Sequence, residues 1–423
     1  MNNPQCTDAY FYYWCGIGRG MVVTFSCDAK LQQFLNYIYL FNQKSLSLQE
    51  LKPDVFIIGQ YSSYKTDMIH TILVIRFRRV GDSVLSMALC HSLKLSFPKA
   101  AVHFVINKGI APLYKDHPDI DKLITFNERE CKGLTYIKKV REVMRSVHYD
   151  VIIDMRSTPK TLLFSLFSLS STYRIGRKKW YNVVHTHRIT TQDGLDRVQS
   201  NLQLMEPLRA EGSLVMSERF PLYITPQEAK DYRAYLAKQG IDVRKPVVLV
   251  AVATRLEHKA WPRERMTEIL RRMLSHFDLQ LVFNYAGDAE KAVATAYFEA
   301  LGRDKRIFLN IEAKNLRELC ALCQASQFFF GNEGGPRHIS QAFEVPSLAI
   351  YPPDIEKDFW LPGHDECFQG VSPDDRMPLS RQKGMTYQER MLLITVEDVW
   401  QQLEPMLRRY VVEMPNENTN EPK

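Results

Sequence analysis

The sequence predicts an α/β protein built from two doubly wound parallel sheets that face each other across a central cleft. Three observations predict this fold. Short apolar runs rich in Val and Ile alternate with segments of helical apolar spacing, as in parallel sheets that are covered by helices on both faces. The alternation comes in two blocks of similar size, separated by a segment that lacks it. Finally, 423 residues suffice for two domains of ordinary size.

The first block begins at Met68. Residues 71–77 (TILVIRF) form a continuous apolar run with β-branched side chains, which predicts a buried strand. A tight turn at 80–82 follows, and helical spacing over 83–96 predicts a helix that ends before Pro98. The further elements expected in this block are strands over 101–107 and 150–155 and helices over 136–147 and 159–169.

The second block follows a stretch, residues 170–220, that is rich in Arg, Lys and His and has little periodicity. We expect loops and a short element or two there, with the crossing between domains near 221–226. The strands expected in the second block lie over 247–252, 279–285, 306–309, 327–330 and 347–351. The helices expected there lie over 262–276, 288–301, 315–325, from the Gly-rich turn to 343, and over 396–409.

These patterns divide the chain into an N-terminal domain over 68–223 and a C-terminal domain over 224–410. Residues 411–423 are rich in Asn, Glu and Pro, which is typical of a disordered tail. Residues 1–67 have a different character and form an extension of uncertain structure. Two explanations stay open: a genuine N-terminal appendage, or an over-extended reading frame whose biological start is Met68.

The composition excludes several classes of protein. With 45% hydrophobic and 24% charged residues the chain is neither disordered nor fibrous, and no run approaches the roughly 20 apolar residues of a membrane span. The net charge of +7 suits a phosphorylated ligand or an anionic membrane surface. Among the eight cysteines only Cys320 and Cys323 have C-x-x-C spacing, without a second ligand pair, so we interpret them as two thiols on a helix and expect no metal.

Ligands of doubly wound sheets bind outside the carboxyl ends of the strands, so the loops there are the first place to search. Asp82 follows the first strand. It is either an N-cap or, if it lies in a cleft, a general base that takes a proton from a sugar hydroxyl. We expect the neighbouring Arg78 and Arg79 to keep this carboxyl ionised and to meet anionic groups of a ligand.

The second block carries candidates for holding a phosphate. Lys259 precedes a helix that begins near Pro262, where an ammonium group and a helix N-terminus can act together on a phosphate; a solvated loop lysine is the alternative. Gly334 and Gly335 would let backbone N–H groups approach a pyrophosphate, and His338 could bond a phosphate or pack in the first turn of a helix.

Two further segments offer polar groups. Glu290 follows another strand, where its carboxylate could accept hydrogen bonds from a ribose or cap a helix. The basic segment 174–180 contributes Arg174, Arg177 and Lys178 to a site for a phosphorylated glycolipid, or else forms a solvated loop. We expect no nucleic-acid partner, because such a partner would need stacking aromatics along a basic stripe and this segment has one tryptophan.

Taken together, these segments resemble the heptosyltransferases, glycosyltransferase family nine. The resemblance covers about residues 68–407 and rests on four landmarks in order. These are the opening RFRRVGDSVLSMALCHSLKLSFPKAAVHFVIN, DVIIDMRSTPKT with YRIGR, HKAWPRERM, and FFFGNEGGPRHISQAFEVPSLAIYPP.

The resemblance implies a GT-B fold and an inverting transfer of heptose from ADP-heptose to a lipopolysaccharide core, without a metal or another cofactor. It places the donor on the C-terminal domain and a glycolipid acceptor on the N-terminal domain, in the cytoplasm at the face of the inner membrane. By position Asp82 resembles the catalytic base and Lys259 the lysine on the donor phosphates. Glu333, Gly334, Gly335 and His338 resemble the turn around the pyrophosphate, and Glu290 a carboxylate on the donor ribose.

The sequence departs from the family at this turn. The usual Asp-Thr-Gly is Glu333-Gly334-Gly335 here, so a hydroxyl is lost and the carboxylate is one methylene longer. The identity of the donor therefore stays undecided, and one alternative is a transferase of the same fold that uses another nucleotide-hexose. A second alternative is a non-catalytic nucleotide-sugar-binding protein. The presence of both Asp82 and Lys259 argues against this second alternative. The sequence does not fix the oligomeric state.

Overall fold

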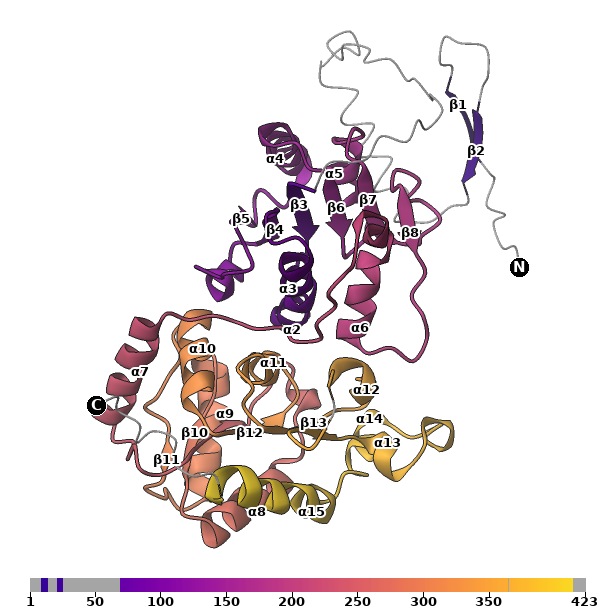
Figure 1. Ribbon diagram of the computed structural model, residues 1–423. Coiled ribbons are helices and arrows are strands. Elements are labelled where there is room, and N and C mark those ends of the chain that lie inside the picture. The colour runs from indigo at the N-terminus through magenta and orange to yellow at the C-terminus, as the bar shows by residue number, and fades with distance from the viewer. Residues whose placement is uncertain (1–8, 14–20, 26–68, 364, 414–423) are drawn as a thin grey trace.

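The computed structural model describes residues 9–13, 21–25, 69–363 and 365–413. Two six-stranded sheets organise residues 69–413, one in an N-terminal half and one in a C-terminal half (Figure 1). Every strand pair within these two sheets is parallel, as the sequence predicted. Within the predicted N-terminal extension the structure describes a separate antiparallel pair, β1 (Ala9–Tyr13) and β2 (Met21–Phe25); the rest of the extension lies outside the described residues.

The N-terminal sheet has the strand order β5-β4-β3-β6-β7-β8. Its strands are β3 (Thr71–Ile75), β4 (Ala101–Asn107), β5 (Lys122–Phe126), β6 (Val151–Asp154), β7 (Tyr173–Arg177) and β8 (His187–Ile189). The elements that accompany it are α2 (Val80–Leu85), α3 (Met87–Ser96), η2 (Ala111–Tyr114), α4 (Gly133–Ser146), α5 (Leu162–Leu166), α6 (Arg197–Leu202) and η3 (Gln203–Glu211).

The C-terminal sheet repeats this arrangement in the order β11-β10-β9-β12-β13-β14. Its strands are β9 (Val247–Ala251), β10 (Gln280–Phe283), β11 (Ile307–Phe308), β12 (Phe328–Asn332), β13 (Ser347–Ile350) and β14 (Phe368–Val371). Its main helices are α7 (Pro226–Lys238), α8 (Arg263–His276), α9 (Gly287–Ala300), α10 (Leu316–Ala325), α11 (Gly335–Ala342) and α15 (Val396–Leu407). The short ones are η4 (Glu257–Lys259), α12 (Lys357–Trp360), α13 (Pro373–Arg376), η5 (Leu379–Arg381), α14 (Tyr387–Met391) and η6 (Arg408–Val412).

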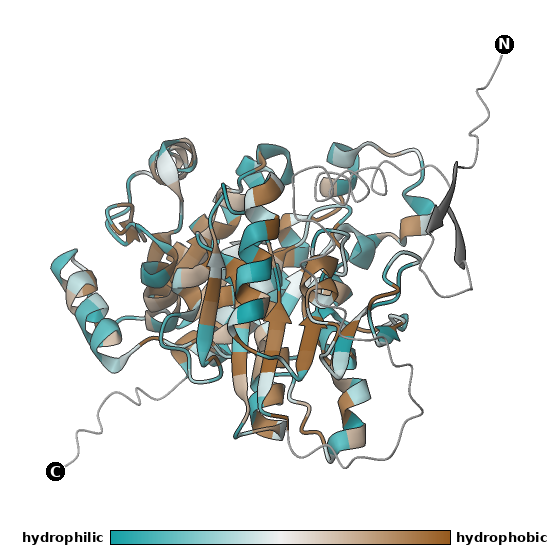
Figure 2. Cartoon of the chain, turned by 90° about the horizontal axis from the view of Figure 1, so that it is seen from above, coloured by the Kyte–Doolittle hydropathy of each residue, from teal (hydrophilic) through white to brown (hydrophobic). Residues whose placement is uncertain are grey.

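Burial explains the predicted strands. Apart from Thr71, the central strands β3 and β9 consist of apolar, mostly β-branched residues that are buried on both faces, and the helices lie over them with their apolar sides inward. Figure 2 shows the resulting layers, with hydrophobic strands in the middle and hydrophilic surfaces on the outer helices. Within the described residues, no helix is both long and apolar enough to cross a bilayer.

The structure adds elements that the prediction lacked, α7 among them, and it corrects three predicted segments. The predicted helix over 83–96 begins earlier and is broken into α2 and α3 at Ser86, whose hydroxyl donates to the carbonyl of Ser83 (2.6 Å). Residues 173–177, interpreted as part of a basic loop, form the buried strand β7. Helical structure also continues to Val412, where we expected a disordered tail from 411.

The two halves contact each other directly. Residues 213–225 connect them without helix or strand, and α2 of the N-terminal half packs against α11 of the C-terminal half. Figure 1 shows α2 and α6 of the upper half facing α11 and α12 of the lower half.

Candidate active site

Both sheets have their topological switch points at the interface between the halves. In each sheet the first three strands in sequence extend to one edge, and the next three extend from the first strand to the opposite edge. The direction therefore switches between β3 and β6 in one sheet and between β9 and β12 in the other. Ligands of doubly wound sheets bind at such points. The loops after β3, β9 and β12 carry Asp82, Lys259 and Glu333, so three of the predicted site residues follow switch-point strands.

Asp82 lies in the first turn of α2 and does not cap it, because the N-cap position is Arg79 and no side chain caps this helix. Oδ1 of Asp82 accepts hydrogen bonds from Arg76 and from Nη2 of Arg197 (3.3 Å). No described residue forms a hydrogen bond with Oδ2, and the side chain keeps 13% of its surface exposed. The carboxylate is therefore held from one oxygen and open at the other, as a general base needs.

The partners of Asp82 differ from those that we predicted. Arg78 and Arg79 are exposed and form no ion pair with it; both have a left-handed backbone (φ 66° and 52°) in the tight loop between β3 and α2. Arg76 takes their place because it continues inward from β3, and burial above all lowers its pKa to about 10. Arg197 comes from α6, in the segment where the sequence pattern lapses.

The β3–α2 loop lies against the start of α11 across the interface. A Cβ atom on Gly81 would stand 2.6 Å from Cδ2 of His338, and one on Gly335 would stand 3.3 Å from Cγ1 of Val80. Only a glycine at 81 permits this approach. The loop that carries Asp82 and the turn that carries His338 are thus in van der Waals contact, as two facing sheets require.

The turn after β12 is held by a chain of hydrogen bonds. Arg337, which is fully buried, donates from its guanidinium group to Nδ1 of His338 and to the carbonyl of Trp360 (2.8 Å). Because Nδ1 accepts, the proton of a neutral His338 sits on Nε2, 3.3 Å from Oε1 of Glu333. The order Arg337–His338–Glu333 fixes the direction in which each group points.

Burial sets the charges of these three side chains. It is the main reason why the pKa of His338 falls to about 4. The positive charge of Arg337 lowers this pKa further, whereas the carboxylates of Glu333 and Asp82 raise it. Burial would raise the pKa of Glu333, but the hydrogen bond from His338 and the charges of Arg337 and Lys259 outweigh it and hold that pKa below its ordinary value. Near neutral pH the contact is therefore between a neutral imidazole and a carboxylate, and the positive charge comes from Arg337 and Lys259.

Lys259 ends the short helix η4, and its ammonium group has no hydrogen-bond or ion-pair partner among the described residues. Asn332, at the end of β12, fixes the nearby loop. Its Oδ1 accepts from the backbone N–H of Trp261 (2.9 Å), and its Nδ2 donates to the carbonyls of Ala251 (3.0 Å) and Val252 (3.1 Å). Our sequence analysis missed Asn332, although an amide at the end of a buried strand is a recognisable signal.

Glu290 bonds to the backbone just before α9 but does not cap its first turn. Its Oε2 accepts from the backbone N–H of Ala286 (2.8 Å) at the start of α9. This bond satisfies the N–H of Ala286 alone, and no described side chain caps the N–H groups of the first turn of α9. A role for the other carboxylate oxygen toward a ribose stays a prediction.

Arg174 and Arg177, which we expected to bind an acceptor, are used inside the N-terminal half. Arg174 donates to the carbonyls of Leu169 (2.7 Å), Ser171 (2.6 Å) and Val184 (2.9 Å). Arg177 donates to the carbonyl of Ser200 and to Oγ1 of Thr191 (3.2 Å). Both guanidinium groups thus brace β7, and of the predicted basic set only Arg78, Arg79 and Lys178 are exposed.

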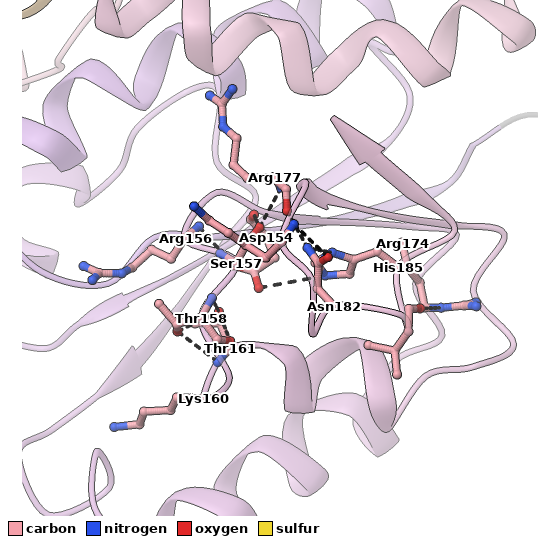
Figure 3. A network of polar contacts seen from close by, with 12 residues as sticks. Asp154, Arg156, Ser157, Thr158, Lys160, Thr161, Arg174, Arg177, Asn182 and His185 are labelled. Atoms are coloured by element: carbon pink, nitrogen blue, oxygen red, sulfur yellow. Dashed lines mark hydrogen bonds and ion pairs between the residues drawn. The ribbon is translucent and has the colours of Figure 1, made fainter. Parts of the chain in front are cut away.

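A buried network supports the loop after β6 (Figure 3). Oδ1 of Asp154 accepts from the backbone N–H groups of Arg156 (3.0 Å) and Ser157 (2.8 Å). Its Oδ2 has no hydrogen-bond partner and lies 3.9 Å from Nε2 of His185, which also has none. Burial raises the pKa of Asp154 to about 6 and lowers that of His185 to about 4. This network fixes the loop that carries Arg156, whose charge acts on Arg76 and Arg197.

Within the described residues, no group of three or more His, Cys, Asp or Glu side chains is placed to hold a metal ion. Cys320 and Cys323 are buried thiols on α10, as we interpreted them, and burial raises the pKa of Cys323 to about 12.

Comparison with known proteins decides the family. The sequence model described as "Glycosyltransferase family 9 (heptosyltransferase)" matches residues 137–367, more than half of the chain. The chain belongs to glycosyltransferase family 9. It is a glycosyltransferase, and the predicted family is confirmed; three of the four landmarks lie within the matched residues, and the opening one precedes them.

Similar proteins agree with this assignment. The chain is 24% identical to lipopolysaccharide heptosyltransferase 3 of Escherichia coli over 313 residues, which cover 72% of this chain and 89% of the relative. A family 9 glycosyltransferase from Veillonella parvula superposes with a TM-score of 0.67 at 16% identity, over 81% of this chain and 98% of that one. Heptosyltransferase WaaC from E. coli, solved with ADP-2-deoxy-2-fluoro heptose, gives 0.60 at 14% identity, over 79% and 99%. The fold is thus GT-B, as predicted.

Proposed function

We propose that this glycosyltransferase moves a heptose from ADP-heptose to a hydroxyl of a lipopolysaccharide core, with inversion at the anomeric carbon and without a metal or another cofactor. One observation carries the proposal: the loop with Asp82 contacts the turn with His338 and Glu333, so a carboxylate of one half meets the predicted diphosphate site of the other. Family membership and the relatives named above support the choice of sugar and acceptor.

The reaction is a single displacement. Oδ2 of Asp82 takes the proton of the acceptor hydroxyl, whose oxygen forms a bond to the anomeric carbon while the bond to the diphosphate breaks on the opposite face. Oδ1 stays with Arg76 and Arg197, so the open oxygen keeps its direction. The products are the new glycoside, the protonated carboxyl and the free nucleoside diphosphate.

The leaving diphosphate gains negative charge and needs fixed positive partners. Lys259 supplies an unpaired ammonium group, and Gly334, Gly335 and Arg337 supply backbone N–H groups at the start of α11, where a helix leaves such groups without internal partners. Charge stabilisation of this kind needs no bound cation.

The acceptor is expected on the N-terminal half. Arg78, Arg79 and Lys178 are the exposed members of the predicted basic set and would meet its phosphate or carboxylate groups. An acceptor embedded in a membrane would bring this half to the lipid surface.

Transfer from another nucleotide-hexose is the second candidate, which the Glu333-Gly334-Gly335 turn favours because it lacks the usual threonine hydroxyl. A thermal-shift series with ADP-, UDP-, GDP- and dTDP-sugars separates the two. A donor at 100 times its Kd should stabilise the fold by about 2.7 kcal/mol, whereas the other nucleotides should give no shift.

Turnover tests the proposal itself. Wild-type protein with ADP-heptose and a deacylated core acceptor should release ADP and form a product of inverted anomeric configuration. Asp82→Asn keeps the shape of the side chain and should lower kcat about 10²- to 10⁴-fold, because the amide cannot take the proton. Turnover of Asp82→Asn at the wild-type rate would exclude Asp82 as the base.

A further inference from the structure

Arg197 links Asp82 to the opposite half of the molecule. It is the first residue of α6, whose start is fixed by a capping box in which Asp196 accepts from the N–H of Gln199 (2.9 Å) and the Gln199 side chain accepts from the N–H of Asp196 (3.3 Å). From this fixed position Nη2 of Arg197 reaches Oδ1 of Asp82 at 3.3 Å.

The other side of the Arg197 guanidinium faces two aromatic rings of the C-terminal half. Its central carbon lies 5.7 Å from the ring centre of Phe359 and 5.6 Å from that of Trp360, both on α12. Distances of this size are those of cation–π contacts. The guanidinium therefore bridges the interface, with a carboxylate on one side and aromatic faces on the other.

Trp360 is itself connected to the predicted diphosphate site. Its carbonyl accepts from Arg337 (2.8 Å), and its ring lies 6.4 Å from that of His338 at an angle of 70°. A continuous series of contacts therefore runs from Asp82 through Arg197 and Trp360 to the turn after β12.

Burial makes these contacts depend on the approach of the two halves. The Arg197 side chain is 18% exposed, and its Nε is buried without a hydrogen-bond partner. Burying a cation costs free energy because its bound water is lost, and only well-placed partners offset this cost. Two partners of Arg197, the rings of Phe359 and Trp360, belong to the other half. If the halves separate, Arg197 loses the rings and regains water, and nothing on the C-terminal side then holds it against Asp82.

A hollow next to these contacts does not suit a diphosphate. It lies between the halves beside α6 and α12, and its lining includes the carboxylates of Asp196, Glu218 and Asp358. These would repel an anion, so this hollow is not a second site for the donor phosphates.

We propose that Arg197 is a positioning residue that couples the approach of the two halves to the alignment of Asp82, and that Phe359 and Trp360 are the surface that receives it. The proposal rests on the proposed function in assigning the proton transfer to Asp82. It concerns catalysis only through Asp82, since Arg197 itself need not contact the sugar.

A double-mutant cycle tests this coupling. Arg197→Ala should lower kcat by at least 10-fold and leave the KM for the donor within about twofold. The variant Phe359→Leu/Trp360→Leu should lower kcat by about 2- to 30-fold, the range of a cation–π contact. Adding these two changes to Arg197→Ala should cause no further loss, because both act through one contact. Losses that multiply, or an unchanged kcat in Arg197→Ala, would overturn the proposal.

Two controls make the result specific. Arg408→Ala removes a guanidinium 5.5 Å from the ring of Phe277, at the end of α8 opposite to the one that follows Lys259, and should leave kcat unchanged. Arg197→Lys keeps the charge without the planar face and should give a kcat between those of the wild type and Arg197→Ala.

Hydrogen exchange tests the coupling without any substrate, so its outcome is separate from that of the proposed function. In Arg197→Ala, amide exchange should become several-fold faster in residues 80–85 and 357–361, with no change in α9. Unchanged exchange in both segments would overturn the proposal. If Arg197→Ala speeds exchange in both segments but the wild type does not turn over ADP-heptose, the proposed donor fails and the coupling stands.

Discussion

The buried carboxyl of Asp154 allows a stability prediction with a defined pH dependence. We consider Asp154→Asn, which keeps the Oδ1 that accepts from Arg156 and Ser157 (3.0 and 2.8 Å). The new amide nitrogen takes the place of Oδ2, which has no partner in the wild type. His185 limits the gain, because the amide of Asn182 contacts its Nδ1 (3.2 Å), and a proton on Nε2 would then face the new amide.

The magnitude follows from the pKa. Burial first of all raises the pKa of Asp154 from 3.8 to about 6. A shift of about 2 units corresponds to roughly 3 kcal/mol. Because the pKa of Asp154 is higher in the folded than in the unfolded state, binding of a proton to this carboxyl stabilises the fold. This stabilisation is complete below pH 3.8 and is lost as the pH rises through 6. About half of this loss has occurred at pH 5 and all of it at pH 8.

Urea unfolding of wild type and Asp154→Asn at pH 5 and pH 8 measures this, since titrating groups remote from position 154 cancel in the difference, and the same pair of measurements in the His185→Gln background removes the contribution of His185. The variant should gain about 1–2 kcal/mol relative to wild type on going from pH 5 to pH 8. Glu228→Gln is the control. The hydrogen bond from Arg317 is the first cause that lowers the pKa of Glu228 to about 2, so its pH dependence falls below pH 4.5 and should be absent between pH 5 and 8. An equal difference between Asp154→Asn and wild type at both pH values would refute the reasoning.

Three more predictions concern the interface and the turn. Gly81→Ala places a methyl group against His338 and should lower kcat strongly without unfolding the protein, whereas Gly109→Ala, with open space around it, should behave as wild type in the same assay. Lys259→Met should lower kcat about 10²- to 10³-fold, because the leaving diphosphate loses a positively charged partner, and Lys259→Arg should retain part of the activity. Equal kcat values for the Lys259→Met and Lys259→Arg variants would contradict this role. Asn332→Ala should cost about 1–3 kcal/mol in urea unfolding because it strands buried backbone groups, and no loss would show that these bonds do not support the loop.

Much of the fold could be predicted from the sequence, because the strands buried on both faces are visible as apolar runs. Of the four strands at the edges of the two six-stranded sheets, only β11 (Ile307–Phe308) was predicted. β5, β8 and β14 are short and partly exposed, so their sequences lack a continuous apolar run. β7 was missed for another reason: the buried Arg177 satisfies its guanidinium group within the fold, so a basic sequence forms an interior strand.

Candidates for the site could be chosen from the sequence where chemistry and chain position coincide, and their roles stay predictions. Asp82, Lys259 and the turn at 333–338 follow strands of the two sheets, and the fold brings them to one interface. Arg197 could not be predicted, because its relation to Asp82 exists only in three dimensions, across 115 positions of the chain. Proximity in sequence favoured Arg78 and Arg79, but the left-handed loop leaves both in solvent.

A crystal structure with the non-transferable donor ADP-2-deoxy-2-fluoro heptose, the ligand present in the WaaC structure, tests the central claim most directly. We predict the diphosphate within hydrogen-bond distance of Lys259 and of the backbone N–H groups at 334–337, with the anomeric carbon turned toward Oδ2 of Asp82. A diphosphate bound elsewhere, or an anomeric carbon that faces away from Asp82, would contradict the account.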